Sequence, residues 1–363
     1  MTPPPDLGPQ GPLSAKDSPI ANKSGGGVIR WTKKDLLGLE ELSREEIELL
    51  LDQAKAFREI SLRPIKKVPA LRGRTVALCF LEPSTRTRAS FELAAKRLSA
   101  DLLSFQGASS SLVKGESVLD MARNIEAMQV DVLVIRHGTS GAPAQVARSI
   151  RSAVVNAGDG SHEHPTQGLV DLFTIQDKKG KIEGLNVLIV GDILHPRVAR
   201  SDFWGLTKMG AKVTLCGPPT LVPAPMETLG AKISYRLDDV LPEADVLIAL
   251  RLQLERQQER YIPSFREYTR LYGIDEEKIR KARPDCIVMH PGPVNRGVEL
   301  SPEVADGPRS VILEQVTNGI AVRMAALYLV AGASHSETAD LPVPQHGPEG
   351  HGGPSPQPVE VGV

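Results

Sequence analysis

The chain has 363 residues, of which 41% are hydrophobic and 24% are charged, and its formal net charge is −1. This length suits two domains of about 100–200 residues each, and the composition is that of a soluble globular protein rather than a disordered or fibrous one. A net charge near zero, without a long basic stripe, excludes the broad cationic surface that nucleic acid or an anionic membrane would bind.

The two ends of the chain lack a periodic apolar pattern. Residues 1 to about 28 and 334 to 363 are rich in Pro and Gly, and we predict that both are disordered tails. No apolar run approaches the roughly 18–20 residues that span a bilayer, and no secretory signal is present, so we expect a cytoplasmic protein. Cys79, Cys216 and Cys286 each adjoin an apolar run without a CxxC pair, which predicts reduced core thiols rather than disulfides or a zinc site.

Between the tails, apolar runs of strand length alternate with amphipathic helical stretches. A capping box, Ser43-x-x-Glu46, begins the first helix. The apolar run Thr75 to Leu81 then predicts a buried strand, and a polar turn leads from it into a helix. The same unit recurs, with further strands predicted at Val130 to Ile135, Val187 to Val190, Val213 to Cys216, Val246 to Leu250 and Cys286 to Met289.

This alternation predicts an α/β fold of two doubly wound domains, each a parallel sheet flanked by helices and joined to the other by helices. The helical stretch from Pro165 to about Asp177 is expected to connect the domains. We expect Asn156 to Ser161, just before it, to be a flexible loop. The last predicted helix, about Val316 to Leu329, is expected to pack back on the first domain.

The segment Ser84 to Arg88 follows the first buried strand and opens a helix. In doubly wound sheets, ligands bind outside the carboxyl ends of the strands, where a helix N-terminus offers unpaired N–H groups to an anion. Hydroxyl and guanidinium donors beside those N–H groups suit a phosphate dianion. The alternative is a solvated helix start capped by Ser or Thr, and composition alone favours neither.

A second helix start carries His164-Pro-Thr-Gln167. The side chains of His164 and Gln167 can both donate a hydrogen bond to a carbonyl oxygen. His162 and His164 are alternatively metal ligands, but no third ligand lies nearby at a recognisable spacing. We therefore favour a carbonyl-polarising His164 over a metal site.

Three arginines follow predicted strands: Arg136, Arg197 and Arg251. A single arginine in this position is usually a surface salt-bridge residue. Three arginines placed this way are harder to assign to the surface. If they converge on one cleft, they require anionic partners, because unpaired cations in a partly desolvated cleft are costly.

Gly191-Asp192 also follows a strand, but the full G-x-G-x-x-G dinucleotide fingerprint is absent from the sequence. The G-x-x-x-x-G-K-[ST] phosphate loop and the G-x-S-x-G elbow are absent too. The sequence therefore disfavours NAD-dependent, ATP-hydrolysing and serine-hydrolase chemistry.

Six motifs taken together resemble the catalytic chain of aspartate carbamoyltransferase, in the aspartate/ornithine carbamoyltransferase superfamily. They occur in the family's order over about residues 30 to 330, and their combination is far more specific than any one of them. The motifs are Phe80-Leu-Glu-Pro-Ser-Thr-Arg-Thr-Arg-Ala-Ser-Phe-Glu92, Lys114-Gly-Glu-Ser117, His164-Pro-Thr-Gln167, Gly191-Asp192 with Arg197, Arg251-x-Gln253, and His290-Pro-Gly-Pro293 with Asn295-Arg296-Gly297.

The resemblance implies transfer of the carbamoyl group from carbamoyl phosphate to the amine of L-aspartate. The products are N-carbamoyl-L-aspartate and phosphate, an early step of de novo pyrimidine (UMP) biosynthesis, and no cofactor or metal is implied. The leaving phosphate can accept the amine proton, so no protein nucleophile or general base is required. The implied carbamoyl phosphate site comprises Ser84, Thr85, Arg86, Thr87, Arg136, His164, Gln167, Gly292 and Pro293, with Arg86, Thr87, Arg136 and His164 as the catalytic residues.

The charge of the predicted site indicates which amino acid accepts the carbamoyl group. Aspartate presents two carboxylates, and the resemblance assigns Lys114, Arg197 and Arg251 to them, with Gln253 in support. Ornithine would require acidic partners, and ornithine relatives carry His-Cys-Leu-Pro where this chain has His290-Pro291-Gly292-Pro293. The alternatives are a carbamoyltransferase for another amino acid or amine, and a catalytically silent scaffold homologue.

The resemblance also implies domains and an assembly. It assigns residues 29–164 plus 316–333 to a carbamoyl phosphate-binding domain and 165–315 to an aspartate-binding domain. It implies a homotrimer in which the loop carrying Ser110 and Lys114 reaches the site of a neighbouring subunit. Regulatory chains or a dihydroorotase partner are left open, and no nucleic acid or membrane partner is expected.

Two positions depart from the family pattern. Family members often carry Ser where this chain has Pro196, and Asn where it has Asp202. Proline fixes φ and removes an N–H donor. The sequence therefore leaves open the pose of Arg197, and with it the affinity for aspartate.

Overall fold

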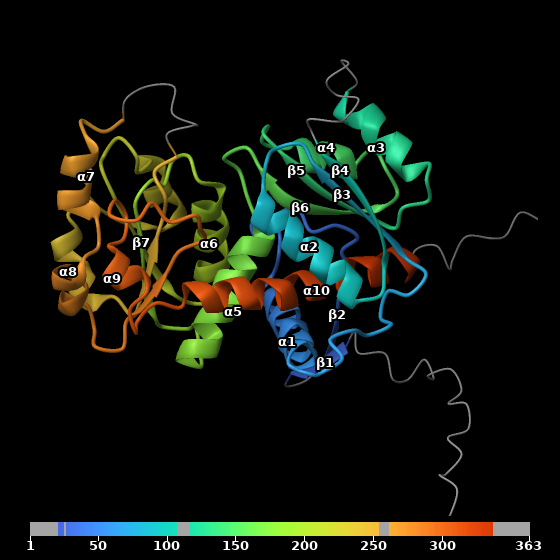
Figure 1. The fold of residues 1–363 in the computed structure, drawn as a ribbon, viewed down its shortest axis with the longest axis horizontal. Helices are drawn as coiled ribbons and strands as arrows, with labels where there is room; N and C mark the ends of the chain where they lie inside the picture. The colour runs from blue at the N-terminus through green and yellow to red at the C-terminus, as the bar shows by residue number, and fades with distance from the viewer. Residues whose placement is uncertain (1–20, 25–26, 107–116, 254–260, 337–363) are drawn as a thin grey trace, which may run out of the picture.

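Two parallel sheets, one in each lobe, form the frame of the molecule (Figure 1). In this computed structural model the described residues are 21–24, 27–106, 117–253 and 261–336. The first sheet has the order β4-β3-β5-β6 and contains β3 (Thr75–Phe80), β4 (Asp101–Gln106), β5 (Val132–His137) and β6 (Ala153–Asp159). The second has the order β11-β10-β7-β8-β9 and contains β7 (Asn186–Val190), β8 (Lys212–Cys216), β9 (Lys232–Ser234), β10 (Val246–Ala249) and β11 (Ile287–Met289).

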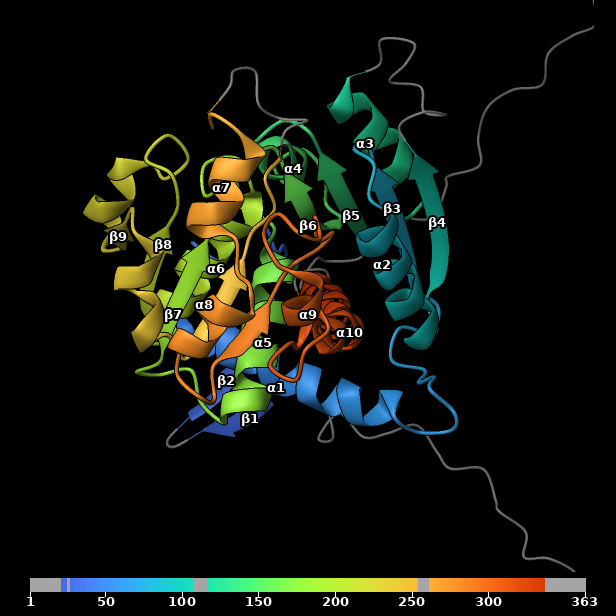
Figure 2. The ribbon, with the colours of Figure 1, turned by 60° about the vertical axis from the view of Figure 1, so that its left-hand side comes forward.

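Helices cover both faces of each sheet (Figure 2). The first lobe holds α1 (Arg44–Ser61), α2 (Thr85–Arg97), α3 (Val118–Glu126) and α4 (Ala142–Ala147). The second holds α6 (Arg197–Lys208), α7 (Phe265–Tyr272), α8 (Glu276–Lys281), α9 (Pro302–Ala305) and the 3-10 turns Ala224–Leu229, Leu237–Asp239 and Leu241–Glu243. Between them run α5 (Pro165–Lys179) and the long α10 (Ile312–Ser336).

The buried strands are apolar on both faces because each face meets helices. On β3, Leu78 packs into the core shared with α1, α2 and α10, whereas Cys79 packs toward α3 and α4. On β7, Ile189 joins the core with α5 and α6, and Val190 joins the core with α7, α8 and α9. The predicted doubly wound α/β fold is confirmed in both lobes.

Several predicted elements are confirmed and a few were missed. The capping box at Ser43 and Glu46 is present, and the six predicted strands lie within three residues of the expected positions. The strands β4, β6 and β9 were missed. The expected flexible loop, residues 156–161, was wrong, because Asn156 to Asp159 form the buried end of β6.

The last helix packs on α1 and α2, as expected. The expectation that no apolar run approaches membrane-spanning length was wrong for Ile312–Ala333, the one helix of the described residues that is long and apolar enough. Most of this stretch, 72%, is buried inside the protein. It is therefore the central core helix of the described fold rather than evidence for a membrane span.

The chain ends also differ from expectation at their boundaries. Residues 21–24 and 27–30 pair as the antiparallel strands β1 (Ala21–Ser24) and β2 (Gly27–Arg30), inside the segment predicted to be a tail. Residues 334–336 continue α10. The rest of the predicted tails, 1–20 and 337–363, lies outside the described residues.

The three cysteines are free and buried, which confirms the prediction of core thiols. Burial raises the pKa of each thiol to about 12. Because the thiolate is the reactive form, these cysteines are structural and unreactive.

Candidate active site

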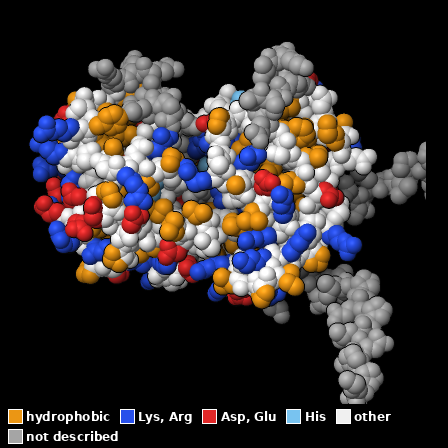
Figure 3. Space-filling view, in the orientation of Figure 1, with side chains coloured by type: hydrophobic (Ala, Val, Ile, Leu, Met, Phe, Trp, Pro, Cys, Tyr) orange, Lys and Arg blue, Asp and Glu red, His pale blue; other side chains and the backbone are white. Residues whose placement is uncertain are grey.

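A cavity of about 550 Å³ opens between the two lobes, at the carboxyl ends of β3, β5, β7 and β10. Lys and Arg side chains gather around the hollow between the lobes (Figure 3). Every predicted site residue within the described chain lines it: Ser84, Thr85, Arg86, Thr87, Arg136, His164, Gln167, Arg197, Arg251, Gln253, Gly292 and Pro293. Ser110 and Lys114 lie outside the described residues.

The N-terminus of α2 faces the cavity. Ser84 is its N-cap residue, yet the side chain makes no capping hydrogen bond within the described structure, and the first turn carries no acidic residue. The Ser84 cap of the alternative interpretation is therefore missing, although Thr85 and Arg86 are exposed as that interpretation expects. The hydroxyl of Ser84, the backbone N–H groups and Arg86 remain available to an anion.

Glu82 joins two of the arginines. Its Oε2 accepts a hydrogen bond from Arg197 Nη2 at 2.5 Å and lies 3.6 Å from Arg136 Nε. Arg136 also donates from Nη1 to the carbonyl oxygen of Ala157 at 3.1 Å. The anionic partner that the converging cations require is thus partly supplied by the protein itself, from a residue to which the sequence analysis gave no role.

Gly158 permits the close approach of these arginines. Its φ is +114°, and a Cβ at this position would lie 2.7 Å from Arg197 Nη1 and 3.0 Å from Arg136 Nη1. Pro196 is the N-cap residue of α6, where a helix does not need the missing N–H. Arg197 follows as the first helical residue and is only 3% exposed, so Pro196 is compatible with an arginine that points into the cavity.

His164 is held by its backbone and kept neutral by its surroundings. Its N–H donates to Ser201 Oγ at 2.9 Å, and the hydroxyl of Ser201 donates to Glu163 at 2.7 Å. Burial, together with the nearby cations Arg136 and Arg323, lowers the pKa of His164 well below its ordinary value. A neutral imidazole can still donate one hydrogen bond to a carbonyl oxygen without adding charge.

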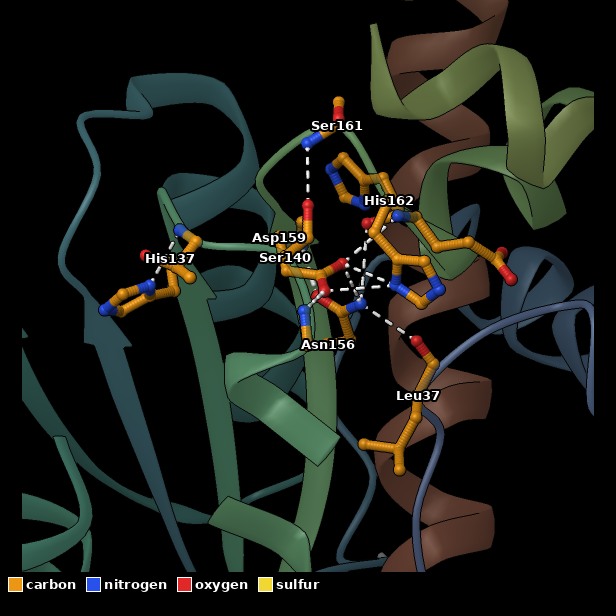
Figure 4. A network of polar contacts seen from close by, with 12 residues as sticks. Leu37, His137, Ser140, Asn156, Asp159, Ser161 and His162 are labelled. Carbon is orange, nitrogen blue, oxygen red and sulfur yellow. Dashed lines mark hydrogen bonds and ion pairs between the residues drawn. The ribbon is translucent and has the colours of Figure 1, made fainter. Parts of the chain in front are cut away.

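The turn between β6 and α5 is fixed by a polar network (Figure 4). Asn156 Nδ2 donates to the carbonyl oxygen of Leu37 at 2.8 Å and to Asp159 Oδ1 at 2.8 Å. Asp159 also accepts hydrogen bonds from the N–H of Gly141 at 2.7 Å and from that of Glu163 at 3.1 Å. These bonds provide hydrogen-bond partners for the polar side chains on which the loop prediction was based.

The metal alternative retains His162 of the two expected ligands and adds two carboxylates. Glu40, His162 and Glu163 bring possible ligand atoms within 4.8 Å of one another, and His164 is not among them. The carboxylate of Glu163 already accepts hydrogen bonds from Leu39 N and Glu40 N. His162 Nδ1 lies 3.1 Å from a carboxylate oxygen of Asp159. The cluster is thus explained by hydrogen bonds within the protein.

Two residues of α10 were missed by the sequence analysis. Gln315 and Arg323 line the cavity, eight residues apart on one face of the helix, and both are buried. Burial lowers the pKa of Arg323 to about 10, with an opposing contribution from Asp171. The available signal was a Gln and an Arg on one face of an otherwise apolar helix.

His290 is also neutral. Its Nδ1 accepts a hydrogen bond from the N–H of Gly292 at 2.8 Å. Burial lowers its pKa to about 3, and Arg251 and Arg86 contribute to the shift. Gly292 has φ +70°, and a Cβ there would lie 3.4 Å from Arg86 Nε, so glycine lets this turn approach the arginine closely.

Together these groups make the described lining of the cavity predominantly cationic and rich in hydrogen-bond donors. A helix N-terminus and Arg86 suit a phosphate, neutral His164 suits an adjacent carbonyl oxygen, and Arg197 and Arg251 suit further carboxylates. Among the described residues that line the cavity, Glu82 is the one carboxylate.

Comparisons with known proteins agree on one family. Residues 34–177 match the carbamoyl-P binding domain of aspartate/ornithine carbamoyltransferase, and residues 183–330 match the Asp/Orn binding domain. The aspartate carbamoyltransferase catalytic subunit of Syntrophobacter fumaroxidans is 59% identical over 300 residues, which cover 83% of this chain and 98% of that protein. That of Syntrophus aciditrophicus is 56% identical over 306 residues, which cover 84% and 100%.

Solved structures show the same fold. Aspartate transcarbamoylase from Trypanosoma cruzi, in complex with carbamoyl phosphate and aspartate, superimposes with a TM-score of 0.74 at 30% identity, covering 82% of this chain and 97% of that one. Ornithine carbamoyltransferase from Pyrococcus furiosus gives 0.73 at 30% identity, with the same coverage of 82% and 97%. The fold alone therefore does not distinguish aspartate from ornithine as the substrate.

Proposed function

Since the chain belongs to the aspartate/ornithine carbamoyltransferase family, we propose that it is an aspartate carbamoyltransferase. It transfers the carbamoyl group from carbamoyl phosphate to the amine of L-aspartate and releases N-carbamoyl-L-aspartate and phosphate. The reaction belongs to pyrimidine biosynthesis. The observation that supports aspartate as the acceptor is the charge of the cavity. Arg197 and Arg251 both line it, and Glu82 is the one carboxylate among the described lining residues.

One group of residues binds carbamoyl phosphate, and another binds aspartate. Ser84, Thr85, Arg86 and Thr87 hold the phosphate with Arg136 beside it, and Gln167, Gly292 and Pro293 hold the carbamoyl nitrogen. Thr87, Arg136 and His164 donate to the carbonyl oxygen, on which negative charge grows as the amine attacks. The C–N bond forms as the bond from the carbonyl carbon to the phosphate oxygen breaks, and phosphate accepts the amine proton.

The acceptor is bound by Arg197 and Arg251, with Gln253 beside Arg251. An ornithine side chain would bring an ammonium group toward these guanidinium groups, which like-charge repulsion opposes. A silent scaffold is disfavoured because every described position expected to bind an anion carries a competent residue that lines the cavity.

An acceptor assay tests the function. The wild-type protein is mixed with carbamoyl phosphate and a panel of amino acids, and both phosphate release and the carbamoylated product are measured. L-Aspartate should be used at least about 10³-fold faster than L-ornithine, since unpaired or opposed charges in a site cost several kcal/mol. An equal or greater rate with another amine would contradict the assignment, and the reaction without an acceptor is the control.

The active form is a homotrimer with shared sites. Support comes from the motif Lys114-Gly-Glu-Ser117, which in the family lies on a loop that also includes the position of Ser110 and reaches a neighbouring subunit. Lys114 then supplies the third cation for aspartate. A larger assembly with regulatory chains or dihydroorotase is compatible with this proposal. We also propose that the enzyme is cytoplasmic.

Mixing two inactive variants tests the shared site. Lys114→Ala and Arg86→Ala each damage a different half of the site, so random mixing should restore about one quarter of the sites to native composition. Recovered activity is measured after dissociation and reassociation. Mixing Arg86→Ala with Ser84→Ala, which damage the same half, is the control and should restore nothing. Absence of recovery in the first mixture, with trimers shown by light scattering, would contradict shared sites.

We keep the domain assignment as a proposal: residues 29–164 plus 316–333 bind carbamoyl phosphate, and residues 165–315 bind aspartate. The matched family domains divide the chain differently. The boundary lies between residues 177 and 183, at the end of α5, and residues 316–330 match the Asp/Orn binding domain. Helix α5 contacts α1, α6 and α10, so it belongs to the packing of both lobes.

A further inference from the structure

Asp171 lies behind the cavity wall and does not line the cavity itself. It follows Gln167 by one turn on α5 and is 0% exposed. Its Oδ1 accepts hydrogen bonds from Gln167 Nε2 at 3.0 Å and from Gln315 Nε2 at 2.7 Å. Because both glutamines line the cavity, one buried carboxylate holds two side chains of its wall, from two different helices.

These bonds decide which end of each amide faces outward. A carboxylate only accepts, so each glutamine has to present its NH₂ end to Asp171 and turn its carbonyl oxygen away. The oxygen of Gln315 accepts from the backbone N–H of His290 at 2.9 Å. The side-chain oxygen of Gln167 is therefore available to accept a hydrogen bond from a ligand in the cavity.

The same bonds reach the turn at Gly292. Asp171 orients Gln315, Gln315 holds the N–H of His290, and His290 Nδ1 accepts from the N–H of Gly292 at 2.8 Å. A continuous chain of hydrogen bonds therefore runs from α5 to the backbone of Gly292, which lines the same cavity as Gln167. Such chains restrict the geometry of all their members.

A second buried carboxyl keeps Asp171 in its accepting role. Asp202 on α6 is 0% exposed, and neither of its oxygens, nor Asp171 Oδ2, has another hydrogen-bond donor in the described structure. A proton on Asp202 supplies that donor to Asp171. Burial and the adjacent Asp171 raise the pKa of Asp202 well above its ordinary value. Arg323, from α10, is the cation that faces Asp171.

Asp202 also explains a departure from the family pattern. An Asn at this position, as family members often have, would donate an N–H to Asp171 permanently. A protonated Asp202 offers an O–H in the same place. The substitution therefore preserves the direction of the hydrogen bond, and with it the acceptor role of Asp171.

We propose that Asp171 is a positioning residue for the nitrogen of the carbamoyl group, because it turns the carbonyl oxygen of Gln167, and through Gln315 the turn at Gly292, toward that nitrogen. The carbamoyl NH₂ group has two hydrogens to donate and requires acceptors. The inference rests on the proposed function, since it takes carbamoyl phosphate as the ligand. Inorganic phosphate lacks the NH₂ group and does not use these acceptors.

Comparing two ligands separates positioning from folding. Asp171→Leu, which has a similar size and no acceptor, should weaken carbamoyl phosphate binding about tenfold or more, while the Kd of inorganic phosphate changes by less than about twofold. Asp171→Asn keeps one acceptor oxygen and can donate to Asp202, so it should bind both ligands nearly as the wild type does. Asp202→Asn is the matched control with a permanent donor and should also resemble the wild type.

The outcomes are distinguishable. Equal weakening of both ligands in Asp171→Leu, or unchanged binding of carbamoyl phosphate, would overturn the inference. If Asp171→Leu does not fold, Gln315→Met removes the arm that runs to Gly292 and leaves the bond to Gln167, so it should show a smaller loss that is still selective for carbamoyl phosphate. A wild type that binds carbamoyl phosphate but carbamoylates no amine would refute the proposed function and leave the binding comparison valid.

Discussion

Replacing Arg86 with Ala should lower kcat/KM for carbamoyl phosphate by about 10³-fold or more, because a charged donor to the leaving phosphate is removed. Arg86 lies in the first turn of α2 and lines the cavity beside Gly292. The phosphate gains charge as the bond to carbon breaks, so the guanidinium group stabilises the transition state more than the ground state. Steady-state kinetics with saturating aspartate provides the measurement.

Arg88→Ala is the matched control for this change. Arg88 lies on the same helix, two residues further on, and is not part of the cavity lining. Arg88 is half-buried outside the cavity, so its loss should change kcat/KM by less than about threefold. Comparable effects of the two substitutions, or an Arg86→Ala variant as active as the wild type, would show that the phosphate site is wrongly placed.

His164→Ala should lower kcat by about 10²- to 10³-fold, the usual effect of removing one donor to a developing oxyanion. His162→Ala is the control, because His162 lies two residues away and does not line the cavity. His164→Gln, which keeps a side-chain donor, should retain more activity than the alanine variant. Similar kcat values for His164→Ala and the wild type would exclude a role for His164 at the carbonyl oxygen.

The pH dependence carries a second expectation for the same residue. The pKa of His164 is lowered by burial and by nearby arginines, so its imidazole stays neutral as pH falls through the ordinary histidine value of 6.5. The wild type should therefore lose no activity between pH 8 and about 6.5 through protonation of His164. An acidic loss of kcat near pH 6.5 that disappears in His164→Gln would contradict a neutral histidine.

The strands were predictable where the residues that form them are apolar. The runs at β3, β7 and β10 are apolar on both faces because helices cover both faces, and this pattern identifies them in the sequence. β6 was missed because Asn156, Gly158 and Asp159 are typical of loops. Only their long-range partners, such as the carbonyl oxygen of Leu37, make a buried strand of them.

The site residues were found through motifs at strand ends and helix starts, and residues without such a position were missed. Gln315 and Arg323 lie within a helix whose composition is that of a core element, so only their position against the cavity gives them a role. The partnership of Asp171 with Asp202 joins residues of two helices and cannot be derived from spacing. Glu82 stood inside a recognised motif, yet its bond to Arg197 depends on how the two lobes meet.

The position of α10 has a consequence for synthesis of the protein. Residues 312–336 follow both sheets in the sequence, yet they pack against α1 and α2, which precede most of the fold. While a ribosome extends the chain, the first lobe therefore exposes the apolar faces of α1 and α2 until residues 312–336 have been translated. Such late closure makes a nascent chain a substrate for chaperones and prone to aggregation.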